Sequence, residues 1–435
     1  MSENFLKITP EVAMLLNRIF DYKGYSVRDT QVSTKDRTVR VILARKKSKS
    51  FSCYRCKSPL ERLRGHYKQT LQELPIMEFT TIVEFWRLKG HCSKCNKARS
   101  EAIDFISPET PHFTYKYTWW LGAICEFATV SRSAEFTKVP ASTLRRIDLG
   151  RMKRMLQKYK IPKVTKIAVD EVYSRKKSHY KGESRNNKFF TVITDLVTGR
   201  VLWVTSSRNK SALDEFFSII GKKACANIQV VAMDQHDPYK ASVKEHCPNA
   251  QVFWDRFHIM QTFNNALNDT RMDLHDQLDK SDPIKKLTRP KYKYLFTMNS
   301  SKRSSEDSSH LKDVIDANQD FFLLELIKER MISFFHSRDE TDARAVLDEI
   351  GLWIYESGFS HLKKWYDNFY SNWDTAKNYF RHRVSTAISE GVNNVIKSLK
   401  RQAFGYRNMD YFKLKIMQRC GYLNSRYIDS PKALA

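Results

Sequence analysis

The sequence has no long apolar run that could cross a membrane. The longest near-apolar stretch, WWLGAICEFATV at residues 119–130, is too short to span a bilayer and contains Glu126. The first residues also lack the basic segment and apolar stretch that mark a signal peptide. These absences argue against membrane-spanning and secreted proteins, and we expect a soluble cytoplasmic protein.

Three catalytic signatures are missing as well. The chain has no GxxxxGK[ST] phosphate loop, no HExxH and no GxSxG. The absence of these motifs argues against ATP hydrolysis at a phosphate loop, zinc-protease chemistry and hydrolysis by an activated serine.

Acidic residues are scarce relative to basic ones. Asp and Glu number 48 against 75 Lys and Arg, which gives a net charge of +27. A surface field of this sign attracts polyanions, so nucleic acid is the first candidate partner. A membrane surface is a weaker candidate, and we expect no membrane association.

Cysteine is too sparse for a disulfide scaffold, with 8 residues in 435, but half of the cysteines form CxxC pairs. Two such pairs supply four thiolates for one tetrahedral structural Zn²⁺, with His66 and His91 as weaker substitutes for one ligand. The alternative is two reducible thiol pairs, which the lack of a thioredoxin-like pattern disfavours. The proposed zinc ligands are Cys53, Cys56, Cys92 and Cys95.

The order of predicted elements indicates a multidomain α/β protein. Strands at 164–170, 188–197 and 200–207 precede a helix, a strand at 227–234, a helix and a strand at 250–255. This β-β-β-α-β-α-β order, completed by a final helix, is that of a ribonuclease-H-like core. The predicted segments are a zinc-ribbon DNA-binding domain (1–110), a helix-turn-helix region (111–160), the first part of the core (161–258), an all-helical insertion (259–384) and the last part of the core with the C-terminal tail (385–435).

Residues 115–160 are predicted to be helical with one interruption at TKVPAST, where Pro140 cannot continue a helix and Ser142 can cap the next. In a helix-turn-helix, base and phosphate contacts come from the start of the second helix. The candidate contacts there are Ser142, Thr143, Arg145 and Arg146. The plain alternative is an ordinary helix connector with solvated charges.

Two carboxylates are predicted at the ends of core strands. Asp170 ends the first strand and Asp234 ends the fourth, and in this topology those strands are adjacent and parallel. Acids so close repel each other unless divalent cations bridge them. A single Asp after a strand is a common turn residue, but two on neighbouring strands favour a site. Glu171 competes with Asp170, but side-chain alternation sends it to the opposite face.

The segment from Ser389 onward is predicted to be an amphipathic helix, whose apolar side carries Val392, Val395, Ile396 and Leu399. A carboxylate in a first helical turn is stabilised by the helix dipole, so Glu390 has either this role or a chemical one, and spacing alone does not decide. Its polar edge carries cations suited to a phosphate backbone, namely Lys397, Lys400 and Arg401. At the end of the fifth strand, Asp255 and His258 are candidates for supporting roles beside the site.

Several segments resemble, in order, the DDE transposases of the bacterial ISL-three insertion-sequence family. They include AVDEVYSRK at 168–176, the DRFH block at 255–258 and SEGVNNVIKSLKRQAFGYRN at 389–408. The resemblance covers nearly the whole chain, and that family also begins with a zinc ribbon and a helix-turn-helix.

The resemblance identifies Asp170, Asp234 and Glu390 as the catalytic triad, and Asp255 and His258 as a related Asp-x-x-His element. It implies Mg²⁺-dependent cleavage and strand transfer at terminal inverted repeats, with a pair of Mg²⁺ ions, replaceable by Mn²⁺, held by the triad. Partners would be the repeats and target DNA, in a homodimer or larger assembly at the bacterial nucleoid. The alternatives are a non-catalytic zinc-ribbon and helix-turn-helix regulator, and a ribonuclease-H-like nuclease without strand transfer.

Overall fold

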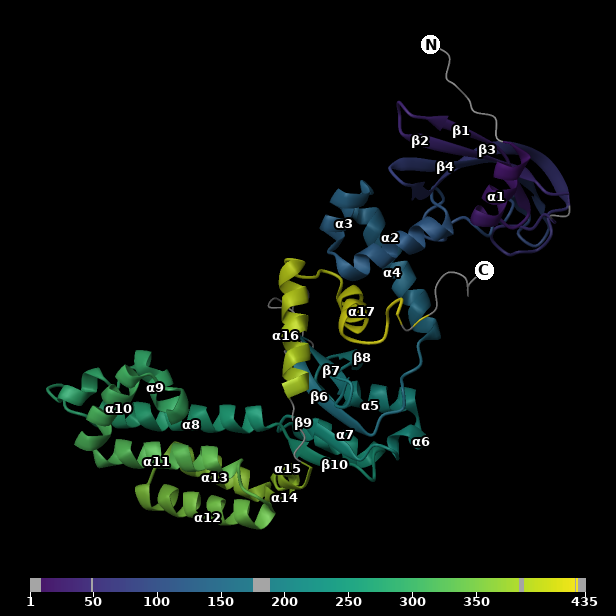
Figure 1. The fold of residues 1–435 in the computed structure, drawn as a ribbon. Helices are drawn as coiled ribbons and strands as arrows, with labels where there is room; N and C mark the ends of the chain where they lie inside the picture. The colour runs from purple at the N-terminus through teal and green to yellow at the C-terminus, as the bar shows by residue number, and fades with distance from the viewer. Residues whose placement is uncertain (1–8, 48–49, 175–187, 383–386, 427, 429–435) are drawn as a thin grey trace. The chain divides into compact units, whose positions relative to one another are not determined.

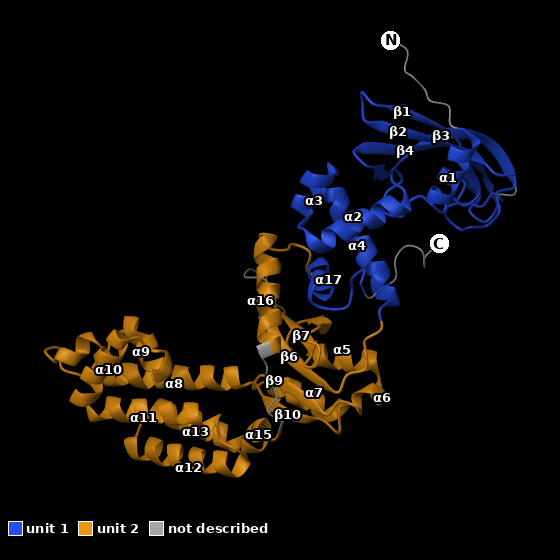
Figure 2. Ribbon diagram, viewed as in Figure 1, with its two compact units in different colours: residues 1–159, 410–435 blue, residues 160–409 orange. Residues whose placement is uncertain are grey.

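The computed structural model describes residues 9–47, 50–174, 188–382, 387–426 and 428. The chain forms two compact units (Figure 2): unit 1 comprises residues 1–159 and 410–435, and unit 2 comprises residues 160–409. Both contain helices and strands, so the protein is mixed α/β, as predicted. Within the described ranges, no helix is both long and apolar enough to cross a membrane.

Unit 1 contains a sheet with strand order β1-β2-β4-β3, in which β5 also pairs with β4 (Figure 1). Alternate side chains of β4, such as Val83 and Phe85, are buried and form one core with Phe20 of helix α1 (Pro10–Phe20). The period-two pattern of the sequence therefore sets which face of the sheet is covered. The strands are β1 (Tyr25–Ser33), β2 (Thr38–Arg45), β3 (Arg62–Ile76), β4 (Phe79–Cys92) and β5 (Lys97–Ser100).

The helical part of unit 1 corrects two details of the prediction. The expected single interruption is joined by a second one at Thr129, whose side chain caps a new helix by accepting from the N–H of Arg132. Ser142 does not cap the last helix, because that helix already begins at Ala141 after Pro140. The helices are α2 (Tyr115–Phe127), α3 (Val130–Thr137) and α4 (Ala141–Lys158).

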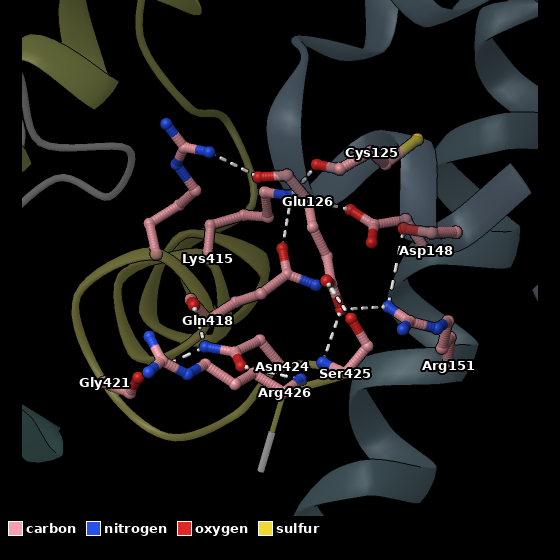
Figure 3. A network of polar contacts seen from close by, with 12 residues as sticks. Cys125, Glu126, Asp148, Arg151, Lys415, Gln418, Gly421, Asn424, Ser425 and Arg426 are labelled. Carbon is pink, nitrogen blue, oxygen red and sulfur yellow. Dashed lines mark hydrogen bonds and ion pairs between the residues drawn. The ribbon is translucent and has the colours of Figure 1, made fainter. Parts of the chain in front are cut away.

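A buried network of charges joins α2 and α4 to α17 (Met409–Cys420), as Figure 3 shows. The ammonium of Lys415 donates to the carbonyl of Cys125 at 2.6 Å and lies 3.2 Å from Oδ2 of Asp148. The Tyr411 hydroxyl donates to the same Oδ2 at 2.6 Å. Because Asp148 is fully buried, its charge depends on these partners.

A second buried ion pair extends the network. Arg151 lies 2.7 Å from Oε1 of Glu126, and both side chains are buried. Ser425, beyond the end of α17, donates its backbone N–H and its hydroxyl to the same carboxylate. The predicted boundaries grouped residues 410–435 with the core, whereas these contacts place residues 410–425 in unit 1. The other predicted boundaries stay predictions, and the one at 384/385 lies outside the described residues.

Unit 2 contains a sheet with strand order β10-β9-β6-β7-β8 (Figure 1). The first three strands along the chain pair antiparallel, and β9 and β10 add to β6 in parallel. The observed element order is the predicted one, with the first helix split at Gly221, whose φ is 80°. The elements are β6 (Lys166–Tyr173), β7 (Phe189–Asp195), β8 (Val201–Ser206), α5 (Lys210–Ile220), α6 (Lys222–Cys225), β9 (Val230–Met233), α7 (Asp237–His246) and β10 (Gln251–Trp254).

All regular elements in the described residues from 256 to 382 are helical, as predicted. They share a core rich in aromatic side chains, including Phe263, Phe334 and Phe369. Near its end, Asn378 donates to the carbonyl of Val252 and so covers part of the edge strand β10. The elements are α8 (Arg256–Gln277), η2 (Pro283–Lys286), η3 (Pro290–Tyr292), α9 (Lys293–Thr297), η4 (Ser300–Lys302), α10 (Ser305–Ala317), α11 (Gln319–Phe334), α12 (Glu340–Ser357), α13 (Ser360–Ser371), α14 (Trp373–Ala376) and α15 (Asn378–His382).

The chain then forms α16 (Ala387–Gln402), which starts two residues before the predicted Ser389 and packs beside β6. Its buried residues include Val392 and Ile396, which lie on the predicted apolar side. Glu390 is thus in the first turn of a helix that contacts the central strand of the sheet.

The network around Asp148 generates a stability prediction. Lys415→Met should lower the free energy of unfolding by about 3 to 5 kcal/mol, because it leaves the buried carboxylate of Asp148 without its cation. Urea unfolding, followed by circular dichroism, measures the change. The double variant Asp148→Asn/Lys415→Met should recover part of the loss.

Lys413→Met is the matched control on the same helix. Lys413 pairs at 3.3 Å with Asp410, whose side chain is 80% exposed. Solvent-exposed pairs contribute little, so this variant should cost less than about 1 kcal/mol. Equal losses for the two lysine variants would contradict the special role of the buried network.

Candidate active site

Three side chains of unit 2 form a group that could hold a metal ion. The ligand atoms of Asp170, Asp234 and His258 all lie within 4.8 Å of one another. Two of these residues are the predicted carboxylates, and the third was predicted as a supporting residue. Oxygen ligands of this kind suit a hard divalent cation.

The strand pairing explains why the two carboxylates meet. Strand β9 ends at Met233, which pairs with Val169, so Asp170 and Asp234 each come directly after the paired parallel stretch. One detail of the prediction was wrong: Asp170 does not end β6, because β6 continues to Tyr173 through antiparallel pairing with β7. The carboxylate therefore projects from a strand held by hydrogen bonds rather than from a loop.

The closeness of the acids affects the proton affinity of Asp170. Burial, followed by the charge of Asp234, raises the pKa of Asp170 to about 6. The backbone N–H of Glu171 donates to Oδ1 of Asp170 at 2.6 Å and opposes this shift. A carboxylate with a raised pKa, next to a second carboxylate, is the arrangement that a bound cation would stabilise.

His258 contacts the second carboxylate. Its Nε2 lies 2.8 Å from Oδ1 of Asp234. Burial alone would lower the pKa of His258, but the hydrogen bond and charge of Asp234, together with the charges of Asp170 and Asp255, raise it to about 9. The imidazole is therefore protonated at neutral pH and forms an ion pair with Asp234.

Asp255 has a structural role in placing this histidine. Its side chain caps α8 by accepting from the N–H of Phe257 at 2.9 Å. The cap fixes the first turn of α8, from which His258 reaches Asp234.

Glu171, the competitor to Asp170, is held in other contacts. Its carboxylate lies 3.4 Å from Arg208 and 3.8 Å from Nε2 of His236. It is not part of the metal-capable group among the described residues. The choice of Asp170 over Glu171, made from side-chain alternation, agrees with this geometry.

Glu390 is exposed in the first turn of α16 and is outside the same group of described residues. One helical turn further on, the side-chain amide of Asn393 donates to Oδ2 of Asp170. Residues three apart lie on the same helix face, so Glu390 is on the face that meets Asp170. Asn393 was not predicted, although its spacing of three from Glu390 was a usable signal.

The predicted cations of α16 differ in their surroundings. Lys397 and Arg401 are exposed, whereas Lys400 donates to the carbonyl of Tyr173 at 3.0 Å. In unit 1, the predicted contacts Ser142, Arg145 and Arg146 are exposed on α4, and Thr143 is half-buried. These residues are accessible at the surface, and their role in DNA binding stays a prediction.

The second metal-capable group lies in unit 1 and consists of the four predicted cysteines, which carry free thiols. Sγ of Cys53 lies 3.9 Å from that of Cys95, and Sγ of Cys56 lies 3.4 Å from that of Cys92. In each CxxC motif the residue after the second cysteine, Lys57 or Asn96, has a positive φ, so the two turns are alike. The weaker candidates, His66 and His91, are outside this group of described residues.

The thiols of this group are suited to binding a cation. Hydrogen bonds from Ser58 lower the pKa of Cys56 to about 6. Burial raises the pKa of its neighbour Cys92 to about 12, and the four sulfur atoms together form the closed ligand set of a structural site.

Comparisons with known proteins show which family the chain resembles. Residues 167–416 match the model of the DDE transposase family ISL3, described as "Transposase". The chain is 22% identical over 403 residues to the transposase for insertion sequence element IS1001 of Bordetella parapertussis, covering 92% of this chain and 97% of the relative. It is 24% identical over 312 residues to the transposase for insertion sequence element IS1557 of Mycobacterium tuberculosis, covering 66% of this chain and 65% of the relative.

The raised pKa of Asp170 predicts a pH-dependent gain in stability for Asp170→Asn. Ionising Asp170 is harder in the folded state, so the folded wild type loses stability as pH rises through about 4 to 6. Below that window the carboxyl is protonated in both states and the penalty is absent. Without divalent cations, the variant should be more stable by about 1 to 3 kcal/mol at pH 7.5.

Urea unfolding in EDTA at pH 7.5 and at pH 4 measures this difference. Asp237→Asn is the control, because Asp237 is exposed in the first turn of α7 and should give no gain. An Asp170→Asn gain that was the same at both pH values would show that carboxylate burial and repulsion do not cause it.

Proposed function

The chain belongs to the ISL3 family of insertion-sequence transposases, and we propose that it binds the terminal inverted repeats of its own element and catalyses metal-dependent DNA cleavage and strand transfer. The observation that carries this proposal is the group formed by Asp170, Asp234 and His258, whose two carboxylates directly follow the paired parallel stretch of β6 and β9. We place the protein at the bacterial nucleoid because its substrate would be DNA.

The core of unit 2 is proposed to be ribonuclease-H-like. Three antiparallel strands come first, and two further strands, each after a helix, add in parallel beside β6. The helix α16 then packs beside β6 after the helical segment. In the proposed fold, Asp170, Asp234 and Glu390 of α16 would lie together near the point where the parallel pairing of β6 and β9 ends.

Asp170, Asp234 and Glu390 are the proposed ligands of Mg²⁺, with Mn²⁺ as a substitute. Carboxylate oxygens are the ligands that Mg²⁺ prefers, and two repelling acids are stabilised by a cation. When bound, a pair of such ions would activate the attacking water or 3′-hydroxyl and stabilise the leaving oxygen.

The remaining side chains position these ligands. Asn393 holds Oδ2 of Asp170, and the His258 imidazolium holds Oδ1 of Asp234. Glu390 lies one turn before Asn393 on the same face of α16, and this shared face supports its assignment as the third carboxylate. His258 also holds a proton beside the site at neutral pH.

The proposed DNA contacts fall on two basic surfaces, each within one unit. On α4 they are Ser142, Thr143, Arg145 and Arg146; on α16 they are Lys397, Lys400 and Arg401. The start of a helix after a tight turn suits base and phosphate contacts, and exposed cations along a helix suit a phosphate backbone. Joining two ends of one element would require at least a dimer during the reaction.

The catalytic proposal is tested by removing single charges. Asp170→Asn, Asp234→Asn and Glu390→Gln should each reduce Mg²⁺-dependent cleavage of a labelled terminal repeat by at least about 10²-fold, since each removes a metal-binding carboxylate. Repeat binding, measured by gel shift, should stay within a few fold of the wild type.

Glu171→Gln is the matched control, because Glu171 is adjacent to Asp170 but pairs with Arg208. It should leave cleavage nearly unchanged. Repeat binding without any wild-type cleavage would favour a non-catalytic regulator, and cleavage without joining to target DNA would favour a nuclease.

The cysteine group is proposed to hold one structural Zn²⁺. Cys92→Ser should abolish zinc binding and unfold the surrounding region, because the buried Cys92 is one of four thiolate ligands. Elemental analysis of the purified protein measures the zinc, and limited proteolysis reports the unfolding. Cys125→Ser, at a buried cysteine of the same unit outside the group, should keep the zinc. A wild-type protein purified without zinc would contradict the assignment.

A further inference from the structure

The end of α16 presents a phenylalanine entirely to solvent. The side chain of Phe404 is 101% exposed. Its backbone has a φ of 51°, in the left-handed region that bulky residues rarely adopt. The ring therefore contributes no burial to the fold and sits on a strained backbone.

The backbone strain at Phe404 arises because Gly405 comes one residue too late to take the first left-handed position after the helix. The chain leaves the helix through hydrogen bonds from Phe404 N–H to the Arg401 carbonyl at 3.0 Å and from Gly405 N–H to the Lys400 carbonyl at 2.9 Å. Helices commonly end with glycine in the first left-handed position. Here Phe404 takes that position and Gly405, with a φ of 93°, takes the next. Glycine at 404 would suit the backbone better, so the aromatic ring does not serve the stability of this helix end.

The charges around Phe404 indicate the chemistry of a ligand that the ring could contact. Arg401 and Arg407, three residues to each side of it, are exposed. On the same helix, Lys397 adds another exposed cation. A flat apolar ring among cations suits a ligand that combines flat apolar groups with negative charge, and unstacked bases on a phosphate backbone have both.

We propose that Phe404 is a wedge that inserts at a base step of the terminal DNA and unstacks it, next to the helix that carries Glu390. This inference rests on the proposed function, because it assumes that element ends lie along α16. Phe404 would be a DNA-positioning residue, with Arg401 and Arg407 binding the flanking phosphates.

The length of α16 sets where the unstacked step should be. Phe404 is fourteen residues after Glu390, which corresponds to about 20 Å along a helix. A duplex that follows the basic edge of α16 covers this length in about six base pairs. The unstacked step is therefore expected about six base pairs from the cleaved phosphate.

The experiment scans 2-aminopurine through a duplex carrying the terminal repeat that flanks the coding sequence. The full-length protein is bound in a buffer without Mg²⁺ or Mn²⁺, so that the DNA stays intact. Fluorescence should rise several-fold at one step when the wild type binds. Phe404→Gly should abolish the rise and weaken binding about 5- to 150-fold, the range that corresponds to loss of one base–aromatic stacking contact. Phe404→Trp should keep both the fluorescence rise and the wild-type affinity.

Two controls separate lost stacking from lost folding. Phe404→Gly should melt at or above the wild-type temperature, because glycine tolerates the left-handed backbone. Val395→Ala, at an exposed apolar residue of the same helix, should leave the fluorescence rise unchanged.

Cleavage of the same duplex with Mg²⁺ distinguishes the wedge from the proposed function. Wild-type cleavage without a fluorescence rise at any step, or an undiminished rise with Phe404→Gly, overturns the wedge and leaves the transposase assignment standing. Failure of the wild type to bind or cleave the repeat overturns both.

Discussion

The repulsion between Asp170 and Asp234 is the constraint around which unit 2 is arranged. Parallel pairing of β6 with β9 ends at Val169 and Met233, so the residues that follow them, Asp170 and Asp234, must lie side by side. A carboxylate at both positions costs free energy unless positive charge is supplied. The fold supplies the His258 imidazolium beside Asp234 and only a neutral hydrogen bond from the Asn393 amide to Asp170, so positive charge from a divalent cation would still stabilise the pair.

Much of this arrangement could be predicted from the sequence, because strong local patterns specify it. The strands of unit 2 appear as apolar runs between turn residues, and their order places Asp170 near Asp234. The CxxC spacing likewise brought the four cysteines together. In both cases, a regular pattern within a short segment predicts which distant residues come together in the fold.

The rest depended on contacts that no local pattern encodes. The continuation of β6 past Asp170 is due to pairing with β7, and the break before α3 depends on a cap by Thr129. The exposed position of Glu390 and the contact made by Asn393 are set by how α16 packs on β6, more than two hundred residues away in sequence. The place of α17 in unit 1 depends on buried charges, whose partners cannot be paired from sequence spacing.

The membership of α17 in unit 1 has a consequence for the order in which the protein is made. The acids buried in α2 and α4, Glu126 and Asp148, are synthesised more than 250 residues before Lys415 and Ser425, which contact them. Until then, Asp148 lacks its cation and the helical part of unit 1 stays incomplete. Unit 2 is translated in between and can fold first. The nascent chain can therefore complete the sheet of unit 2, next to which Asp170 and Asp234 lie, before the helices of unit 1 are finished.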